Sequence, residues 1–255
     1  MEAFYTVSGF LVGAVIGVTG VGGGALMTPL LVLVFGVAPT TAVATDLLYA
    51  AITKSGGMWV HTRRKGVDWP LVGRLAAGSV PASLVTLAVL QLFAYDHARL
   101  SAVITTSLGF ALILSAAALL LKDKLVQGSR RIWRGPTRPS GAAMVVIGAV
   151  LGALVTLSSV GAGALGVAAL TVLAPGMAAA RIVGTDIAHA VPLTLVAGLG
   201  HAASGSVDWT LLGSLLVGSL PGIWLGSLFS HQLPERLLRA LLAFMLVLIG
   251  GRLAW

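Results

Sequence analysis

Two glycine-rich segments inside long apolar stretches have the residue types of an anion-binding site. Gly20–Gly24 holds four glycines in five positions, and Gly161 and Gly163 follow a pair of serines. Glycine disfavours a helix by about 1 kcal/mol per residue, so each segment predicts a break in a helix. Unwound backbone at membrane depth lines a cavity or is buried in protein, and its free N–H groups attract anions. The expected substrate-binding residues are Thr19, Gly20, Val21, Gly22, Gly23, Gly24, Ser158, Ser159, Val160, Gly161, Ala162 and Gly163, with Lys54 as a charge partner.

The alternative for both segments is close helix packing through small residues. A phosphate-binding loop is excluded, because neither segment is followed by Gly-Lys-Ser or Gly-Lys-Thr.

Four ionisable residues lie in apolar stretches, where a charge at the bilayer centre costs about 2.5–3.5 kcal/mol. Asp46 and Lys54 share one stretch, and Asp186 and His189 share another. A helix would place Asp46 and Lys54 about 12 Å apart, too far for direct pairing. Asp186 and His189 are three residues apart and can meet on one helix face. We expect Asp46, Asp186 and His189 to take part in proton coupling.

Structural roles are the alternative for these residues. Asp46 and Asp186 stand near the starts of their stretches and could cap helices. Lys54 could extend its ammonium to the basic surface segment 61–65 instead of contacting a substrate.

The composition indicates an all-α integral membrane protein. Of 255 residues, 57% are hydrophobic and 9% are charged, against about 25% charged in soluble domains. Apolar runs of about 20 residues, the length that spans a bilayer, recur along the chain. Backbone polar groups must be satisfied within such a run, so the runs are helices. We expect a multi-pass membrane protein.

Charge and cysteine content limit the partners. The net charge of +8 comes from clustered basic residues, which the positive-inside rule explains without nucleic-acid binding. Cysteine is absent, which excludes disulfides and thiolate metal sites. We expect the lipid bilayer and a small anion as partners, a homo-oligomer as a possible assembly, and neither a cofactor nor a metal.

The chain also predicts an internal duplication with an offset of about 140 residues. The matching islands are Thr45-Asp46 with Thr185-Asp186, Val67-Asp68-Trp69 with Val207-Asp208-Trp209, Gly78-Ser79 with Gly218-Ser219, and Pro81 with Pro221. The predicted units are membrane repeat 1 at 1–121, a basic cytoplasmic linker at 122–140, and membrane repeat 2 at 141–255. Later spans are expected to begin near Thr40, Trp69 and Ala98 in the first repeat, and near Ala180, Trp209 and Glu235 in the second.

The relative orientation of the repeats depends on how each glycine-broken stretch crosses. If the broken stretch forms a helical hairpin, each repeat crosses the membrane an odd number of times, and the two repeats have inverted orientations. If it crosses once with a break, the two repeats are parallel. The segment 201–205, which is equivalent to the basic segment 61–65, has no Lys or Arg. That difference favours the inverted arrangement.

Three motifs resemble the TauE/SafE sulfite exporter family, also called the 4-toluene sulfonate uptake permeases. They are Gly20–Gly24 followed by Leu26-Met27-Thr28-Pro29, then Thr45-Asp46-Leu47, then His61–Trp69. The resemblance covers nearly the whole chain. It implies transport of small anions, typically sulfite, sulfonates or sulfur-containing organic acids, across the bacterial inner membrane. The chain departs from the family pattern at Asp46 and Asp186, where Ser is frequent.

The sequence therefore predicts a secondary transporter that holds its substrate between the two glycine breaks. Two alternatives stay open. One is an anion channel, and the other is an intramembrane hydrolase built from Ser158, Ser159, His189 and Asp186.

Overall fold

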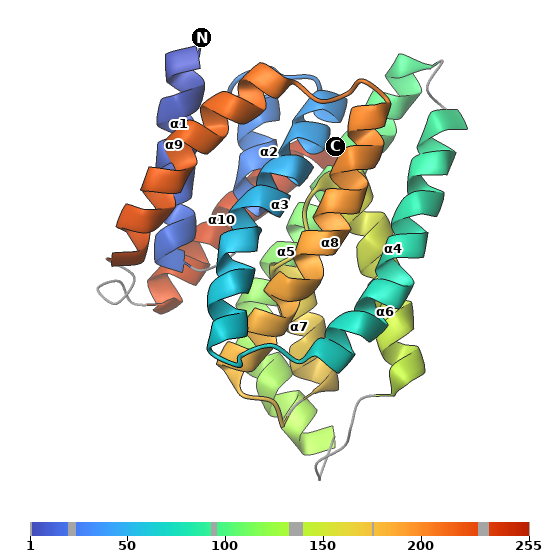
Figure 1. Ribbon diagram of the computed structural model, residues 1–255, viewed down its shortest axis with the longest axis vertical. Coiled ribbons are helices and arrows are strands. Elements are labelled where there is room, and N and C mark those ends of the chain that lie inside the picture. Colours follow the sequence, from blue (N-terminus) through green and yellow to red (C-terminus); the bar gives the residue numbers. More distant parts are fainter. Residues whose placement is uncertain are drawn as a thin grey trace.

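The computed structural model describes residues 2–19, 24–92, 96–132, 140–174, 176–228 and 235–254. These residues form ten α-helices and no strand (Figure 1). The helices are α1 (Glu2–Thr19), α2 (Gly24–Leu33), α3 (Pro39–Arg63), α4 (Trp69–Leu92), α5 (His97–Ile132), α6 (Gly141–Ser158), α7 (Ala164–Leu173), α8 (Ala179–Ala203), α9 (Trp209–Leu228) and α10 (Glu235–Ala254).

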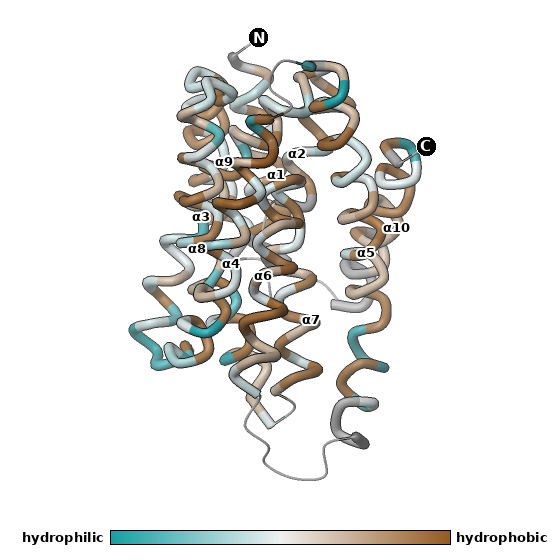
Figure 2. Tube along the Cα trace, turned by 90° about the vertical axis from the view of Figure 1, so that its right-hand side faces the viewer, coloured by the Kyte–Doolittle hydropathy of each residue, from teal (hydrophilic) through white to brown (hydrophobic). Residues whose placement is uncertain are grey.

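The outer surface is apolar along the length of the bundle, as lipid contact requires. Phe110, Val146, Val217 and Phe244 are all more than half exposed, although they stand in the middle of helices. Figure 2 shows hydrophobic residues along most of the helical segments. In the described part, α4, α5, α6, α8 and α9 contain stretches long and apolar enough to cross a membrane. The prediction of an all-α, multi-pass membrane protein is confirmed.

The predicted helix starts agree with the structure within a residue. α3 begins at Pro39 and α8 at Ala179, each preceded by an alanine N-cap. α4 and α9 begin at the two predicted tryptophans. Both tryptophans are at least half exposed, as residues that anchor a helix end at the interface are. α5 continues to Ile132, so residues 122–132 of the predicted linker are helical.

Two helix pairs, α1–α2 and α6–α7, occupy opposite halves of the bundle. In Figure 1, α1 and α2 lie in the upper half and α6 and α7 in the lower half, and Figure 2 agrees. The remaining helices include α3 and α8, which pack against each other, and α5 and α10, which also form a pair. This is the placement expected of inverted repeats that open with hairpins. The duplication itself stays a prediction.

The opening helix of each half packs on the fourth helix of the other half. α1 contacts α9, and α6 contacts α4. Gly9 and Gly13 of α1 face the backbone of Leu215 and Ser219 in α9. The equivalent residues of α6, Gly148 and Gly152, face the backbone of Leu75 and Ser79 in α4. Glycine permits such close approach in membranes, so these glycines fill the packing role, at positions away from the two breaks.

Asp68 and Asp208 cap the helices that they precede. The Asp68 carboxylate accepts from the Leu71 N–H at 3.3 Å, and the Asp208 carboxylate accepts from the Leu211 N–H at 2.9 Å. Their own N–H groups donate across the halves. Asp68 donates to Thr185 Oγ1 at 3.0 Å and Asp208 to Thr45 Oγ1 at 3.2 Å. The two capped loops are thereby fixed to α8 and α3.

Replacing Gly218 by alanine should destabilise the protein by about 1–3 kcal/mol, because a Cβ there overlaps the Thr6 carbonyl oxygen of α1. A backbone atom cannot rotate away as a side chain could. Gly213 of the same helix has no atom within 4 Å of the equivalent position. Gly213→Ala is therefore the matched control. Thermal unfolding in detergent should give a lower Tm for Gly218→Ala alone, and equal Tm values would contradict the close packing.

Candidate functional site

The predicted second break is a real interruption between two helices. α6 ends at Ser158 and α7 begins at Ala164. The intervening backbone has φ of 58° at Ser159, 117° at Gly161 and 138° at Gly163. Glycine adopts such angles far more readily than other residues, which explains its placement at 161 and 163. The prediction that this segment is unwound is confirmed.

The first break lies partly outside the described residues. α1 ends at Thr19 and α2 begins at Gly24. Residues 20–23, which include the predicted site residues Gly20, Val21, Gly22 and Gly23, lie outside the described part. Their proposed contact with substrate stays a prediction.

Two polar side chains of α3 hold the second break. Ser159 donates its hydroxyl to Asp46 Oδ2 at 3.0 Å, and Lys54 Nζ donates to the Ala162 carbonyl oxygen at 2.6 Å. Asp46 is fully buried and Lys54 is 8% exposed. Spacing along α3 keeps Asp46 and Lys54 from pairing directly, as predicted, and the break lies where both side chains can reach it.

Asp46 also connects the break to the other hairpin. Thr28 of α2 donates its hydroxyl to the same Oδ2 atom that Ser159 contacts. The second oxygen, Oδ1, has no hydrogen-bond partner among the described residues. One carboxylate on α3 thus joins α2 from the first half to the α6–α7 segment of the second.

Asp186 has a different environment from Asp46. It is 2% exposed on α8 and lies against Gly166 of α7, where an added Cβ would overlap its Oδ1 atom. Thr28 and Ser159 both donate to Asp46, and within the described residues no hydroxyl donates to Asp186. Lys54 attracts both carboxylates electrostatically and forms an ion pair within 4 Å with neither of them in the described part.

The spacing allows His189 to meet Asp186, but no hydrogen bond joins these two residues in the described part. His189 Nε2 instead lies 2.9 Å from Ser79 Oγ of α4, and both residues are buried. Three-residue spacing places two side chains on one helix face, but the imidazole is directed to the neighbouring helix. His189 is therefore fixed by Ser79, which the sequence analysis did not include in the site.

The structure contradicts the three structural roles that the sequence left open for Asp46, Asp186 and Lys54. Asp46 and Asp186 are inside α3 and α8, whose N-caps are Ala38 and Ala178, so neither carboxylate is a cap. Lys54 does not extend to the 61–65 surface, because its ammonium binds the Ala162 carbonyl.

The hydroxyl groups of the suggested hydrolase do not meet a histidine. Ser159 donates to Asp46, and Ser158 donates to the Leu154 carbonyl at 2.6 Å. His189 is bound to Ser79. The described residues therefore do not assemble the hydrolytic triad that Ser158, Ser159, His189 and Asp186 could supply.

The start of α7 has unused hydrogen-bond donors. In the part of the chain that the structure describes, the N–H groups from Gly161 to Leu165 reach no acceptor, whereas those of Gly166 and Val167 bind Gly161 and Gly163. The first N–H groups of a helix have no partner within it and carry partial positive charge. The Lys54 ammonium adds a full positive charge beside these N–H groups, so the break is electropositive where it meets α7.

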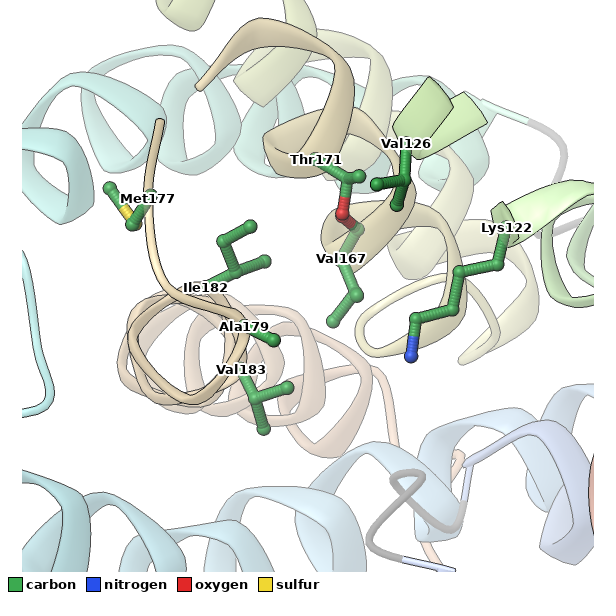
Figure 3. A pocket seen from close by; sticks show the side chains of 8 residues that line it. All are labelled: Lys122, Val126, Val167, Thr171, Met177, Ala179, Ile182 and Val183. Carbon is green, nitrogen blue, oxygen red and sulfur yellow. The ribbon is translucent and has the colours of Figure 1, made fainter. Parts of the chain in front are cut away.

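A pocket of about 110 Å³ opens between α5, α7 and α8 (Figure 3). Seven of its eight lining residues are uncharged, and the eighth is Lys122 of α5. Val183 stands one turn before Asp186, and Val167 follows Gly166 in α7. Two lining residues of the pocket are therefore near Asp186 and Gly166 along their own helices.

Sequence reasoning missed Thr28, Ser79 and Gly166 as parts of the site. Thr28 did carry a signal, because it stands in the Leu26–Pro29 motif of the family resemblance. Ser79 and Gly166 carried none, since a serine and a glycine in an apolar helix are ordinary packing residues.

Comparison with known proteins gives one family and several relatives. The family model described as "Sulfite exporter TauE/SafE" matches residues 5–253. Probable membrane transporter protein YjnA of Bacillus subtilis (strain 168) is 39% identical over 257 residues, covering 99% of this chain and all of that protein.

More distant relatives carry similar descriptions. Probable membrane transporter protein YdhB of the same strain is 26% identical and covers 96% of each chain. A probable membrane transporter protein of Xylella fastidiosa (strain Temecula1 / ATCC 700964) is also 26% identical, over 97% of this chain and 93% of its own. No solved structure matches the chain.

Proposed function

The chain belongs to the sulfite exporter TauE/SafE family of membrane transporters, and we propose that it is a secondary transporter of small anions in the bacterial inner membrane. Sulfite, sulfonates and sulfur-containing organic acids are the substrate classes. The observation that carries this proposal is the Lys54 ammonium, buried and bound to the unwound segment that joins α6 to α7.

The donors around this segment suit an oxyanion. An ammonium has three N–H groups, and one of them binds the Ala162 carbonyl, which leaves two for a ligand. The unused N–H groups at the start of α7 add neutral donors and the positive end of a helix. Sulfite and sulfonate groups present several acceptor oxygens to these donors at the start of α7.

The basic residues support a cytoplasmic assignment for one end of the bundle. Arg63, Arg64 and Lys65 are exposed at the end of α3, and Lys122 and Lys124 stand toward the end of α5. Figures 1 and 2 both place these two ends in the lower half of the bundle. By the positive-inside rule this end faces the cytoplasm. The pocket that contains Lys122 would then be the cytoplasmic entrance for the anion.

The test is uptake of radiolabelled sulfite into proteoliposomes that contain the purified protein, with taurine, sulfate and non-sulfur carboxylates as competitors. We expect saturable uptake that sulfonates compete for. Flux that does not saturate would favour a channel. Competition by carboxylates alone would move the substrate class away from sulfur compounds.

A variant pair tests the entrance in the same assay. Lys122→Gln should raise the KM for sulfite several-fold on the cytoplasmic side, because it removes the charge of the pocket. Lys124→Gln, on the exposed side of the same helix, should leave KM unchanged. Equal KM values for the two variants would remove the pocket from the transport route.

A further inference from the structure

Asp46 has one satisfied and one unsatisfied oxygen. Thr28 and Ser159 both donate hydroxyl hydrogens to Oδ2, so this oxygen carries no proton. Oδ1 has no partner among the described residues, although Asp46 is fully buried. A proton on Oδ1 would itself need an acceptor, and the described residues offer none. A buried polar atom without a partner is costly, and a ligand with positive charge would remove that cost.

Other oxygens surround the same point. The Thr28 and Ser159 hydroxyls donate to Asp46 and keep their lone pairs for a ligand. α6 ends at Ser158, and the carboxyl end of a helix carries partial negative charge. The surroundings of Asp46 are therefore rich in oxygen acceptors.

The local charges are also unbalanced. Asp46 and Asp186 carry two negative charges when ionised, and both interact with a single ammonium, that of Lys54. Lys54 binds the Ala162 carbonyl, not either carboxylate. Lys54 balances one carboxylate, and a cation at Asp46 or a proton on Asp186 would balance the other.

We propose that Asp46, Thr28 and Ser159, here called the Asp46 cradle, bind a sodium ion. Oxygen-only ligands suit hard cations, and one monovalent ion would neutralise the single Asp46 carboxylate. Thr28 belongs to α2 and Ser159 follows α6, so the ion would join the two hairpins. The sodium site itself does not depend on the proposed function. Its consequence, that sodium is the coupling ion for anion transport, rests on that function. Proton coupling is then left to Asp186 and His189.

Binding of ²²Na⁺ to the purified protein, without any anion present, tests the cradle directly. Wild-type protein should bind Na⁺ saturably and gain thermal stability when NaCl replaces choline chloride at constant ionic strength. Asp46→Asn should lose both effects. Ser159→Ala should weaken binding by about tenfold, the equivalent of one lost contact of roughly 1.4 kcal/mol.

The control is Ser115→Ala, which removes another buried hydroxyl without a partner in the described part, on a helix that contributes nothing to the cradle. It should bind Na⁺ as the wild type does. If Asp46→Asn does not fold, the comparison of Na⁺ binding by Ser159→Ala and Ser115→Ala still tests the site. Absence of saturable binding by the wild type, or equal binding by these two variants, overturns the site. Because no anion is added, failure of sulfite uptake would leave this result unaffected.

Discussion

Lys54→Met should reduce the affinity for sulfite by about 10- to 100-fold, the effect of losing one charged hydrogen bond worth about 1.5–3 kcal/mol. Methionine keeps an unbranched side chain of similar length and removes the ammonium. The Ala162 carbonyl would lose its partner, and both buried carboxylates would lose their counter-charge. Sulfite uptake as a function of concentration measures the change as a rise in KM.

Lys124→Met is the matched control, since this lysine is exposed on α5. It should transport sulfite with the wild-type KM. A wild-type KM for Lys54→Met would show that the ammonium holds the unwound segment and does not contact the anion. The proposed binding mode would then be contradicted.

Gly166→Ala should abolish transport and lower the Tm. A Cβ at this position overlaps Asp186 Oδ1, and the carboxylate is buried, with 2% exposure. Alanine has a higher helix propensity than glycine, by about 1 kcal/mol, and this difference alone would stabilise the variant. We expect the clash to outweigh it, because overpacking of a filled interior costs about 1–3 kcal/mol.

Gly73→Ala in α4 controls for the change in helix preference, because no atom lies within 4 Å of its Cβ position. It should transport normally and unfold at or above the wild-type Tm. Combining Gly166→Ala with Asp186→Ala should restore part of the lost Tm, since the carboxylate is then absent. Unaltered Tm and uptake for Gly166→Ala alone would mean that Asp186 is free to move.

The helix boundaries were largely predictable, because the residues that mark them are local signals. Asp before a span accepts from the first N–H groups, and Trp beside it suits the interface. Asp68, Trp69, Asp208 and Trp209 stand where these signals predict. The second break was predictable for the same reason, since Gly161 and Gly163 need a backbone that a helix does not offer.

The partners of the helices were not predictable from their own sequences. A helix in lipid is apolar on the side that faces protein and on the side that faces lipid, so periodicity does not identify the contact face. Gly9 of α1 gives no indication that it meets Leu215 of α9.

The site was predictable in part. The cost of burying Asp46, Lys54 and Asp186 marked them as functional candidates, and the structure places all three around the second break. Their contacts depend on residues that only the assembled bundle brings near. Thr28 reaches Asp46 from α2, and Ser79 binds His189 from α4.

The pairing of α1 with α9 has a consequence for biosynthesis. Gly9 leaves the ribosome long before its contact Leu215, because the two residues are far apart in the sequence. During that interval the glycine face of α1 cannot yet pack on α9. Insertion of α1 is thus separated in time from its packing on α9. A nascent chain that stops before α9 would leave α1 without this partner.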